Sequence, residues 1–213
     1  MYPTATVAER IADAMMHVIG VTGAILGAVF LLIWATDEVE PAQVTALAIY
    51  ATALITTFTA SAVYNMMPYD APRPMLRRID HAAIYLKIAG TYTPLVVMIG
   101  SGFAYLILGI VWALAALGMV LKLFFWQRPG RYGPLLYVIM GWLSVLLIWS
   151  LWPLVPAKAM LLLGVGGALY TLGVPIYAAK KMPFSTAIWH GFVVAASACF
   201  FAGIVISVAS MSA

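Results

Sequence analysis

The stretch that decides the fold is IAGTYTPLVVMIGSGFAYLILGIVWALAALGMVL, residues 88–121, a continuous run without a charged side chain. A transmembrane helix needs about 20 predominantly apolar residues, so this run is too long for one crossing of the bilayer. Gly100-Ser101-Gly102 lies near its middle, and two glycines around a serine are a strong turn signal between apolar segments. We therefore predict two membrane-spanning helices joined at these residues.

Uncharged runs of membrane-spanning length also lie on both sides of this stretch. They cover residues 18–36, 41–69, 132–157, 159–179 and 182–213. The chain is 65% hydrophobic and 8% charged, which leaves too little polar surface to cover a water-soluble fold. We predict an all-α bundle of seven transmembrane helices that forms a single domain over residues 1–213. The predicted spans are residues 17–36, 43–67, 80–99, 103–124, 133–152, 158–178 and 187–209.

The basic residues predict the orientation of these spans. Nine of them fall before the first span or in alternate loops, and all nine then lie on one side of the membrane: Arg10, Arg73, Arg77, Arg78, Lys122, Arg128, Arg131, Lys180 and Lys181. The opposite side carries Lys158 and the acidic residues Asp37, Glu38 and Glu40. Cytoplasmic loops are enriched in Lys and Arg, so we expect a cytoplasmic N-terminus and an external C-terminus. An even number of spans would break this alternation.

Several other classes of protein fit the sequence poorly. The net charge of +4 is explained by topology and by contact with anionic headgroups, so we expect no nucleic-acid partner. The first residues lack the basic start and cleavage site of a secretory signal, and the single cysteine, Cys199, excludes an internal disulfide. A retinal protein needs a lysine deep in its last helix, and residues 182–213 contain none.

Polar side chains within membrane spans are costly and often mark a functional site. In this chain they gather at the cytoplasmic ends of the predicted spans, and they include all three histidines: Asp13, His17, Ser61, Asn65, Asp80, His81, Lys87, Thr186 and His190. Their gathering at one end predicts a polar pocket on the cytoplasmic side of the bundle.

The spacing of these residues shows which of them share a helix face. Residues four apart lie on one face, which pairs Ser61 with Asn65 and Thr186 with His190, and places Asp13 and His17 in a column with Glu9. Headgroups, backbone groups or arginines can equally satisfy such side chains, and we favour this structural role for His17 and His81. Asp80 has Arg77 and Arg78 nearby in sequence, so a structural role by pairing with an arginine and a role in a functional site both stay open. Lys87 lies deeper, where a lysine snorkels or pairs within the bundle.

Three motifs stand out in the sequence: Ser61-Ala-Val-Tyr-Asn65, then Arg77-Arg-Ile-Asp80-His-Ala-Ala-Ile-Tyr85 with Ala89-Gly-Thr-Tyr-Thr-Pro94, and finally Ile188-Trp-His190-Gly-Phe-Val193. They resemble motifs of the hemolysin III family, the bacterial branch of the progestin and adipoQ receptor (PAQR) superfamily. The segment from Glu9 to His17 is similar to a further family signature, so the resemblance covers essentially the whole chain. The resemblance implies a seven-helix architecture, in agreement with the span count.

The resemblance also implies a zinc ion near the cytoplasmic side. In the family its ligands are one histidine ending the second helix and two histidines four apart on the seventh, with a carboxylate and a serine close by. His190, Asp80 and Ser61 match these positions, but Asn65 and Thr186 stand where the other two histidines are expected. Neutral amide and hydroxyl oxygens are poor replacements for imidazole, so the sequence predicts that ordinary tight zinc binding is lost. A rearranged site built from His17, Asp80 and His190 remains an alternative.

Three functions follow from these expectations. The favoured one is a non-catalytic protein of the bacterial inner membrane that acts in membrane-lipid homeostasis or sensing, with lipids as partners and a metal-free pocket lined by Asn65, Thr186, His17 and His81. The second is a zinc-dependent lipid amidase or hydrolase, in which Asp80 and Ser61 are catalytic and His190 and Asp80 hold the metal. A pore-forming protein is the third, although no ring of charge or amphipathic pore-lining helix is evident in the sequence.

Overall fold

The described part of the chain, residues 6–125, 133–179 and 182–212 of a computed structural model, consists of helices joined by short loops. The helices are α1 (Val7–Glu38), α2 (Pro41–Met66), α3 (Arg73–Ile99), α4 (Gly102–Phe124), α5 (Gly133–Trp142), α6 (Val145–Leu151), α7 (Ala157–Ala178) and α8 (Ser185–Ser212). Six of them, all except α5 and α6, are long and apolar enough to span a membrane. The all-α prediction is confirmed, and the chain is a multi-pass membrane protein.

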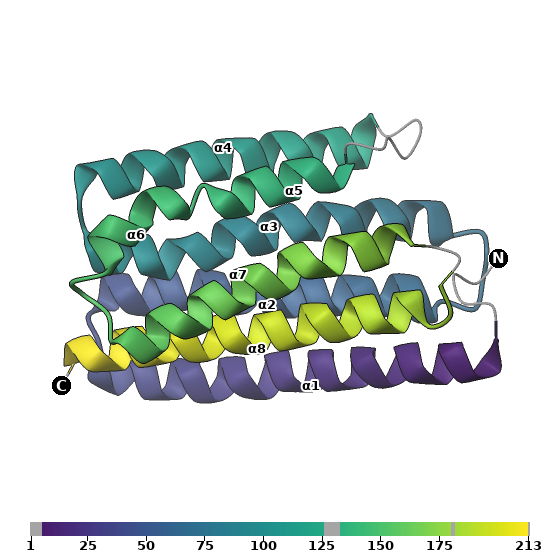
Figure 1. The fold of residues 1–213 in the computed structure, drawn as a ribbon, viewed down its shortest axis with the longest axis horizontal. Coiled ribbons are helices and arrows are strands. Elements are labelled where there is room, and N and C mark those ends of the chain that lie inside the picture. Colours follow the sequence, from purple (N-terminus) through teal and green to yellow (C-terminus); the bar gives the residue numbers. More distant parts are fainter. Residues whose placement is uncertain (1–5, 126–132, 180–181, 213) are drawn as a thin grey trace.

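The helices lie side by side in an elongated bundle, and the start of α1 and the end of α8 are at opposite ends of it (Figure 1). Consecutive long helices pack against each other in order from α1 to α4, and α8 packs against both α7 and α1. This last contact brings the first and last helices of the chain together. It allows polar residues near the starts of α1 and α8 to meet.

Two helices begin well before the predicted spans, and the other long helices begin within two residues of theirs. α1 begins at Val7 rather than residue 17, because a capping box starts the helix there: Glu9 N–H donates to Thr6 Oγ1 (3.2 Å) and the Thr6 N–H donates to Glu9 Oε2 (2.8 Å). α3 begins at Arg73 rather than residue 80. Hydropathy detects only the part of a helix inside the hydrocarbon, so polar first turns fall outside the predicted spans.

The fifth predicted span, residues 133–152, is interrupted. α5 ends at Trp142, a turn follows at residues 143–144, and α6 continues along the bundle in contact with α3 (Figure 1). Carbonyl groups freed by such a break need donors inside the protein, because lipid offers none. The Tyr92 hydroxyl of α3 donates to the carbonyls of Met140 (2.7 Å) and Gly141 (2.9 Å), and this satisfies them. The arrangement is consistent with seven helical crossings.

Glycines allow close helix contact at some positions of the bundle. A Cβ atom on Gly20 of α1 would lie 2.6 Å from the ring of Phe58 on α2, and one on Gly166 of α7 would lie 2.8 Å from the ring of Phe200 on α8. Gly23 and Gly167 have no such neighbour within 4 Å. Small residues at helix interfaces are typical of membrane bundles, where they let backbones approach each other.

Candidate functional site

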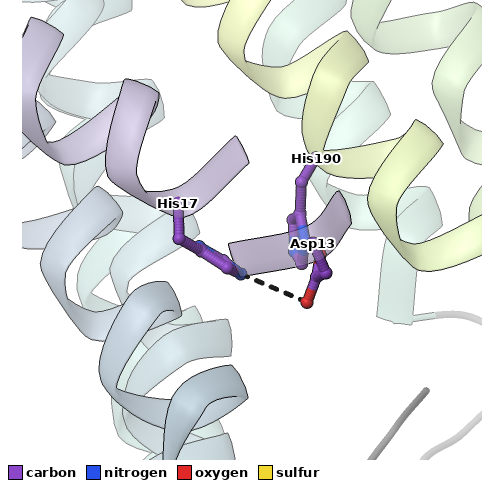
Figure 2. A group of neighbouring side chains, drawn as sticks. All are labelled: Asp13, His17 and His190. Carbon is purple, nitrogen blue, oxygen red and sulfur yellow. Dashed lines mark hydrogen bonds and ion pairs between the residues drawn. The ribbon is translucent and has the colours of Figure 1, made fainter. Parts of the chain in front are cut away.

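Three ligand-type side chains meet where α1 contacts α8. Asp13 and His17 lie one helical turn apart on the same face of α1, and His190 lies in the second turn of α8 (Figure 2). Asp13 is fully buried and His17 is 4% exposed, while His190 is half-buried. One potential ligand atom from each residue lies within 4.8 Å of the other two. We call Asp13, His17 and His190 the α1–α8 cluster.

The contacts within this cluster are short and polar. His190 Nδ1 and Asp13 Oδ1 are 2.5 Å apart, a hydrogen bond whose direction depends on the histidine tautomer. Asp13 Oδ2 lies 3.5 Å from His17 Nε2, and the two imidazole ring centroids are 4.4 Å apart. Asp13 Oδ2 and His17 Nε2 are both buried without a hydrogen-bond partner among the described residues. The Asp13 carboxylate therefore lies between the two histidines, and its contact with His17 is longer than its contact with His190.

Asp80 and Ser61 lie beside the α1–α8 cluster. The Asp80 carboxyl group lies close enough to His190 and His17 for electrostatic interaction, and Ser61 and Arg77 are also among its interaction partners. Asp80 comes from the second turn of α3 and Ser61 from α2, so four helices contribute to one polar region. The predicted gathering of Ser61, Asp80, His17 and His190 at one end of the bundle is present in the structure.

Comparison with known proteins agrees with this architecture. The family model described as Haemolysin-III related matches residues 6–201. The chain belongs to the hemolysin III family. It is 36% identical to the Hemolysin-3 homolog of Bacillus subtilis (strain 168) over 197 residues, which is 92% of each chain, and 35% identical to Hemolysin-3 of Bacillus cereus over 199 residues, 93% of this chain and 91% of that one.

A more distant human relative supports the wider superfamily. The chain is 27% identical to the Monocyte to macrophage differentiation factor of Homo sapiens over 199 residues, covering 89% of this chain and 80% of the human protein. The likeness therefore spans nearly the whole helical bundle, which is consistent with placement of the hemolysin III family within the PAQR superfamily.

The zinc ligands that the hemolysin III resemblance implies do not fit the residues present. Asn65 is buried, and its side-chain amide donates to the Ser61 carbonyl at 2.9 Å and lies 3.4 Å from Ser61 Oγ. Thr186 is half-buried in the first turn of α8, one turn before His190. Neither supplies an imidazole, so the expected three-histidine site cannot form, and only His190 of that ligand set remains.

His81 lies on a different side of α3. The hydroxyl of Tyr137 on α5 donates to its backbone carbonyl at 3.0 Å, and Lys122 of α4 and Arg77 are close enough to act on its imidazole. The described neighbours of His81 therefore include residues of α3, α4 and α5, while those of Asp80 include residues of α1 and α8.

Lys87 lies two helical turns deeper in α3 than Asp80, about 10 Å along the helix axis. It pairs within the bundle: its Nζ atom donates to Ser197 Oγ of α8 at 2.6 Å and lies 4.7 Å and 5.1 Å from the ring centroids of Phe58 and Tyr170. The Tyr170 hydroxyl is 2.8 Å from the same serine oxygen. A hydroxyl and two aromatic faces thus surround the amine.

The sequence predicts Asp13 as one of the polar side chains at the cytoplasmic end of the bundle but gives it no catalytic or ligand role. The hemolysin III resemblance implies Asp80 as the carboxylate of the site, whereas the carboxylate in direct contact with His190 is Asp13. The available signal was the four-residue spacing of Asp13 and His17 on one helix face. The packing of α1 against α8 then brings His190 into contact with this face.

Proposed function

We propose that this hemolysin III-family protein acts in membrane-lipid homeostasis or sensing in the bacterial inner membrane, by binding a lipid beside its polar site.

The start of α1 is cytoplasmic in this proposal and the end of α8 is external. Alternation of the long antiparallel helices supports this orientation, because Arg10, Arg73, Arg77, Arg78 and Lys122 then lie at one end of the bundle, the end that carries the α1–α8 cluster. Four further basic residues of the same predicted side lie outside the described residues: Arg128, Arg131, Lys180 and Lys181.

The observation that carries the lipid proposal is an apolar groove next to the α1–α8 cluster. The groove has a volume of about 710 Å³ and is lined by residues of α1, α7 and α8 and of the loop before α8. Its lining includes Ala12 and Met16, which are neighbours of Asp13 and His17 in the chain, and Gly191, which follows His190. An open groove lined by apolar side chains suits the acyl chain of a lipid, because contact with the chain covers their apolar surface.

The position of the groove on the bundle supports an acyl chain as its occupant. Met15, Phe184 and Ile188 line it and are exposed, so it opens onto the outer surface of the helices. Around a membrane-spanning bundle that surface meets lipid tails. Methionine side chains are flexible and polarizable, which lets Met15 and Met16 adapt to chains of different shape.

Photo-crosslinking tests this proposal. The protein would be reconstituted with a phospholipid carrying a diazirine in one acyl chain, illuminated, and digested to locate the labelled residues. Labelling should concentrate on the groove lining. Ala195→Trp, which places an indole in the groove, should lower that labelling, while Ala198→Trp, at an exposed position of the same helix outside the groove, should leave it unchanged. Equal labelling of all lipid-facing helices, insensitive to Ala195→Trp, would contradict lipid binding at this place.

A lipid hydrolase is the second candidate function, favoured by one arrangement. A carboxylate and a serine, Asp80 and Ser61, lie beside His190, and a positioned carboxylate can move a proton to or from a reacting amide. Fatty-acid release from ceramide-like amides tests this. Asp80→Asn should lower the rate by about 10²–10⁴-fold if Asp80 handles the proton. Asp70→Asn, at a side chain 81% exposed, is the control, and the absence of release from the unmodified chain would rule the hydrolase out for these substrates.

A further inference from the structure

The α1–α8 cluster has the composition of a metal site that differs from the one implied by the hemolysin III resemblance. It offers two imidazoles and one carboxylate, and two of its three members come from α1 rather than from α2 and α8. We propose that Asp13, His17 and His190 bind a Zn²⁺ ion. This inference stands independently of lipid binding, because it concerns only the three side chains and their immediate neighbours.

The distances suit zinc after a small adjustment. Zinc–nitrogen and zinc–oxygen bonds of about 2.0–2.1 Å place neighbouring ligands of a tetrahedral site about 3.3 Å apart. Asp13 Oδ2 and His17 Nε2 are 3.5 Å apart, close to that value. The contact between His190 Nδ1 and Asp13 Oδ1 is shorter, 2.5 Å, as in a hydrogen bond in which His190 Nδ1 carries the proton. Zinc would replace that proton, and the two side chains would separate by less than an ångström.

The unpartnered atoms of the cluster point to a cation. Asp13 Oδ2 and His17 Nε2 are buried and face each other, yet neither has a hydrogen-bond partner among the described residues. Leaving a buried polar atom without a partner costs about 1–3 kcal/mol, so native proteins rarely do so without a reason. A cation bound between an imidazole lone pair and a carboxylate oxygen satisfies both atoms at once.

The charge of the surroundings also suits a divalent ion. Asp13 supplies one negative charge as a ligand, and the Asp80 carboxyl group lies close to both histidines. Arg77 is also among the interaction partners of Asp80. Three protein ligands leave a fourth position for water, which is the pattern of zinc sites that keep an open coordination position. Two imidazoles with a carboxylate fit zinc better than magnesium or calcium, which prefer oxygen ligands alone.

Metal analysis of the full-length chain, purified in detergent from cells grown with added zinc, tests the assignment. The unmodified protein should carry about one zinc per chain after dialysis against a weak chelator. Asp13→Asn, His17→Gln and His190→Gln should each lose at least about tenfold in zinc affinity. His81→Gln is the matched control, since it removes the one remaining histidine of the chain, and it should keep its zinc. Asp80→Asn should also keep zinc, because Asp80 is a neighbour of the site and not one of its ligands.

X-ray absorption at the zinc edge gives a readout that does not depend on the variants folding equally well. The spectrum of the unmodified protein should show two imidazoles and light oxygen or nitrogen ligands, without sulfur. Four results would each overturn the proposal: no stoichiometric metal in the unmodified chain, iron in place of zinc, equal zinc in all variants, which indicates adventitious metal, or loss of zinc in Asp80→Asn with retention in Asp13→Asn. Size-exclusion profiles matching that of His81→Gln identify the variants that have folded.

Discussion

Lys87 is a cation at mid-depth of the bundle without a carboxylate partner. All seven acidic residues of the chain lie within the described residues, and none of them forms an ion pair with it. Its 8% exposed side chain is satisfied by the Ser197 hydroxyl and by the faces of Phe58 and Tyr170. A cation over an aromatic ring is stabilised by the ring quadrupole, and the effect grows when water is excluded. The site therefore replaces a counter-ion with one hydrogen bond and two π faces.

This arrangement predicts that substitutions of Lys87 and of Ser197 have different effects on the free energy of unfolding. Lys87→Met keeps the shape of the side chain and removes the cost of burying a charge, so the free energy of unfolding should stay equal or rise. Ser197→Ala removes the oxygen that accepts from Lys87 Nζ and should lower the free energy of unfolding by about 1–3 kcal/mol. Urea unfolding in mixed micelles measures both values. In the double variant the serine effect should largely disappear, and a full loss in that background would show that Ser197 acts independently of Lys87.

At the scale of the helices, sequence patterns predict the spans better than their interruptions. Each predicted span corresponds to a single long helix except residues 133–152, which become α5 and α6. Charge-free length indicates a crossing, whereas a break depends on whether a neighbour can bond the freed carbonyls. Here that neighbour is Tyr92, which is remote in sequence from the break at Leu143 and Ser144.

Tyr92→Phe tests the role of this hydroxyl. The substitution keeps the ring but removes the donor to the Met140 carbonyl inside the bundle. The Gly141 carbonyl loses one of its hydrogen-bond donors. The free energy of unfolding should fall by about 1–3 kcal/mol, and hydrogen exchange should increase in α5 and α6. Tyr105→Phe, on α4 with 47% of its side chain exposed, is the control. Unchanged exchange in α5 and α6 would mean that the break is held by other contacts, such as the Ser144 hydroxyl on the Gly141 carbonyl.

For the candidate site too, the sequence predicts the separate parts but not the packing that brings them together. Helical spacing places Asp13 and His17 on one face of α1, and hydropathy places His190 at the same end of the bundle, so each part is predictable separately. Their meeting depends on α8 packing against α1, a contact between segments more than 170 residues apart in the sequence. Packing of this kind is set by interface shape, for example at Gly20, where Phe58 and Val194 leave no room for a side chain. A sequence pattern does not specify such shapes.

At the scale of the whole molecule, the number of crossings fixes the relation between the two ends of the chain. Six helices are long enough to span, and α5 with α6 supplies the remaining crossing only if the interrupted pair traverses the bilayer. With that crossing the termini lie on opposite sides. Without it they lie on the same side, and the start of α7, which carries Lys158, would lie on the same side as the basic residues before α5. Charge bias favours the first arrangement.

Reporter fusions distinguish the two arrangements. Alkaline phosphatase, which is active only outside the cytoplasm, should be active when fused after Ala213 and inactive when fused after Phe124, at the end of α4. A fluorescent protein that matures only in the cytoplasm should give the reverse pattern at both positions. Activity of the phosphatase after Phe124, or its inactivity after Ala213, would refute the proposed topology. The second of these results would specifically indicate that α5 and α6 enter the membrane and return, because the first four crossings would remain as proposed.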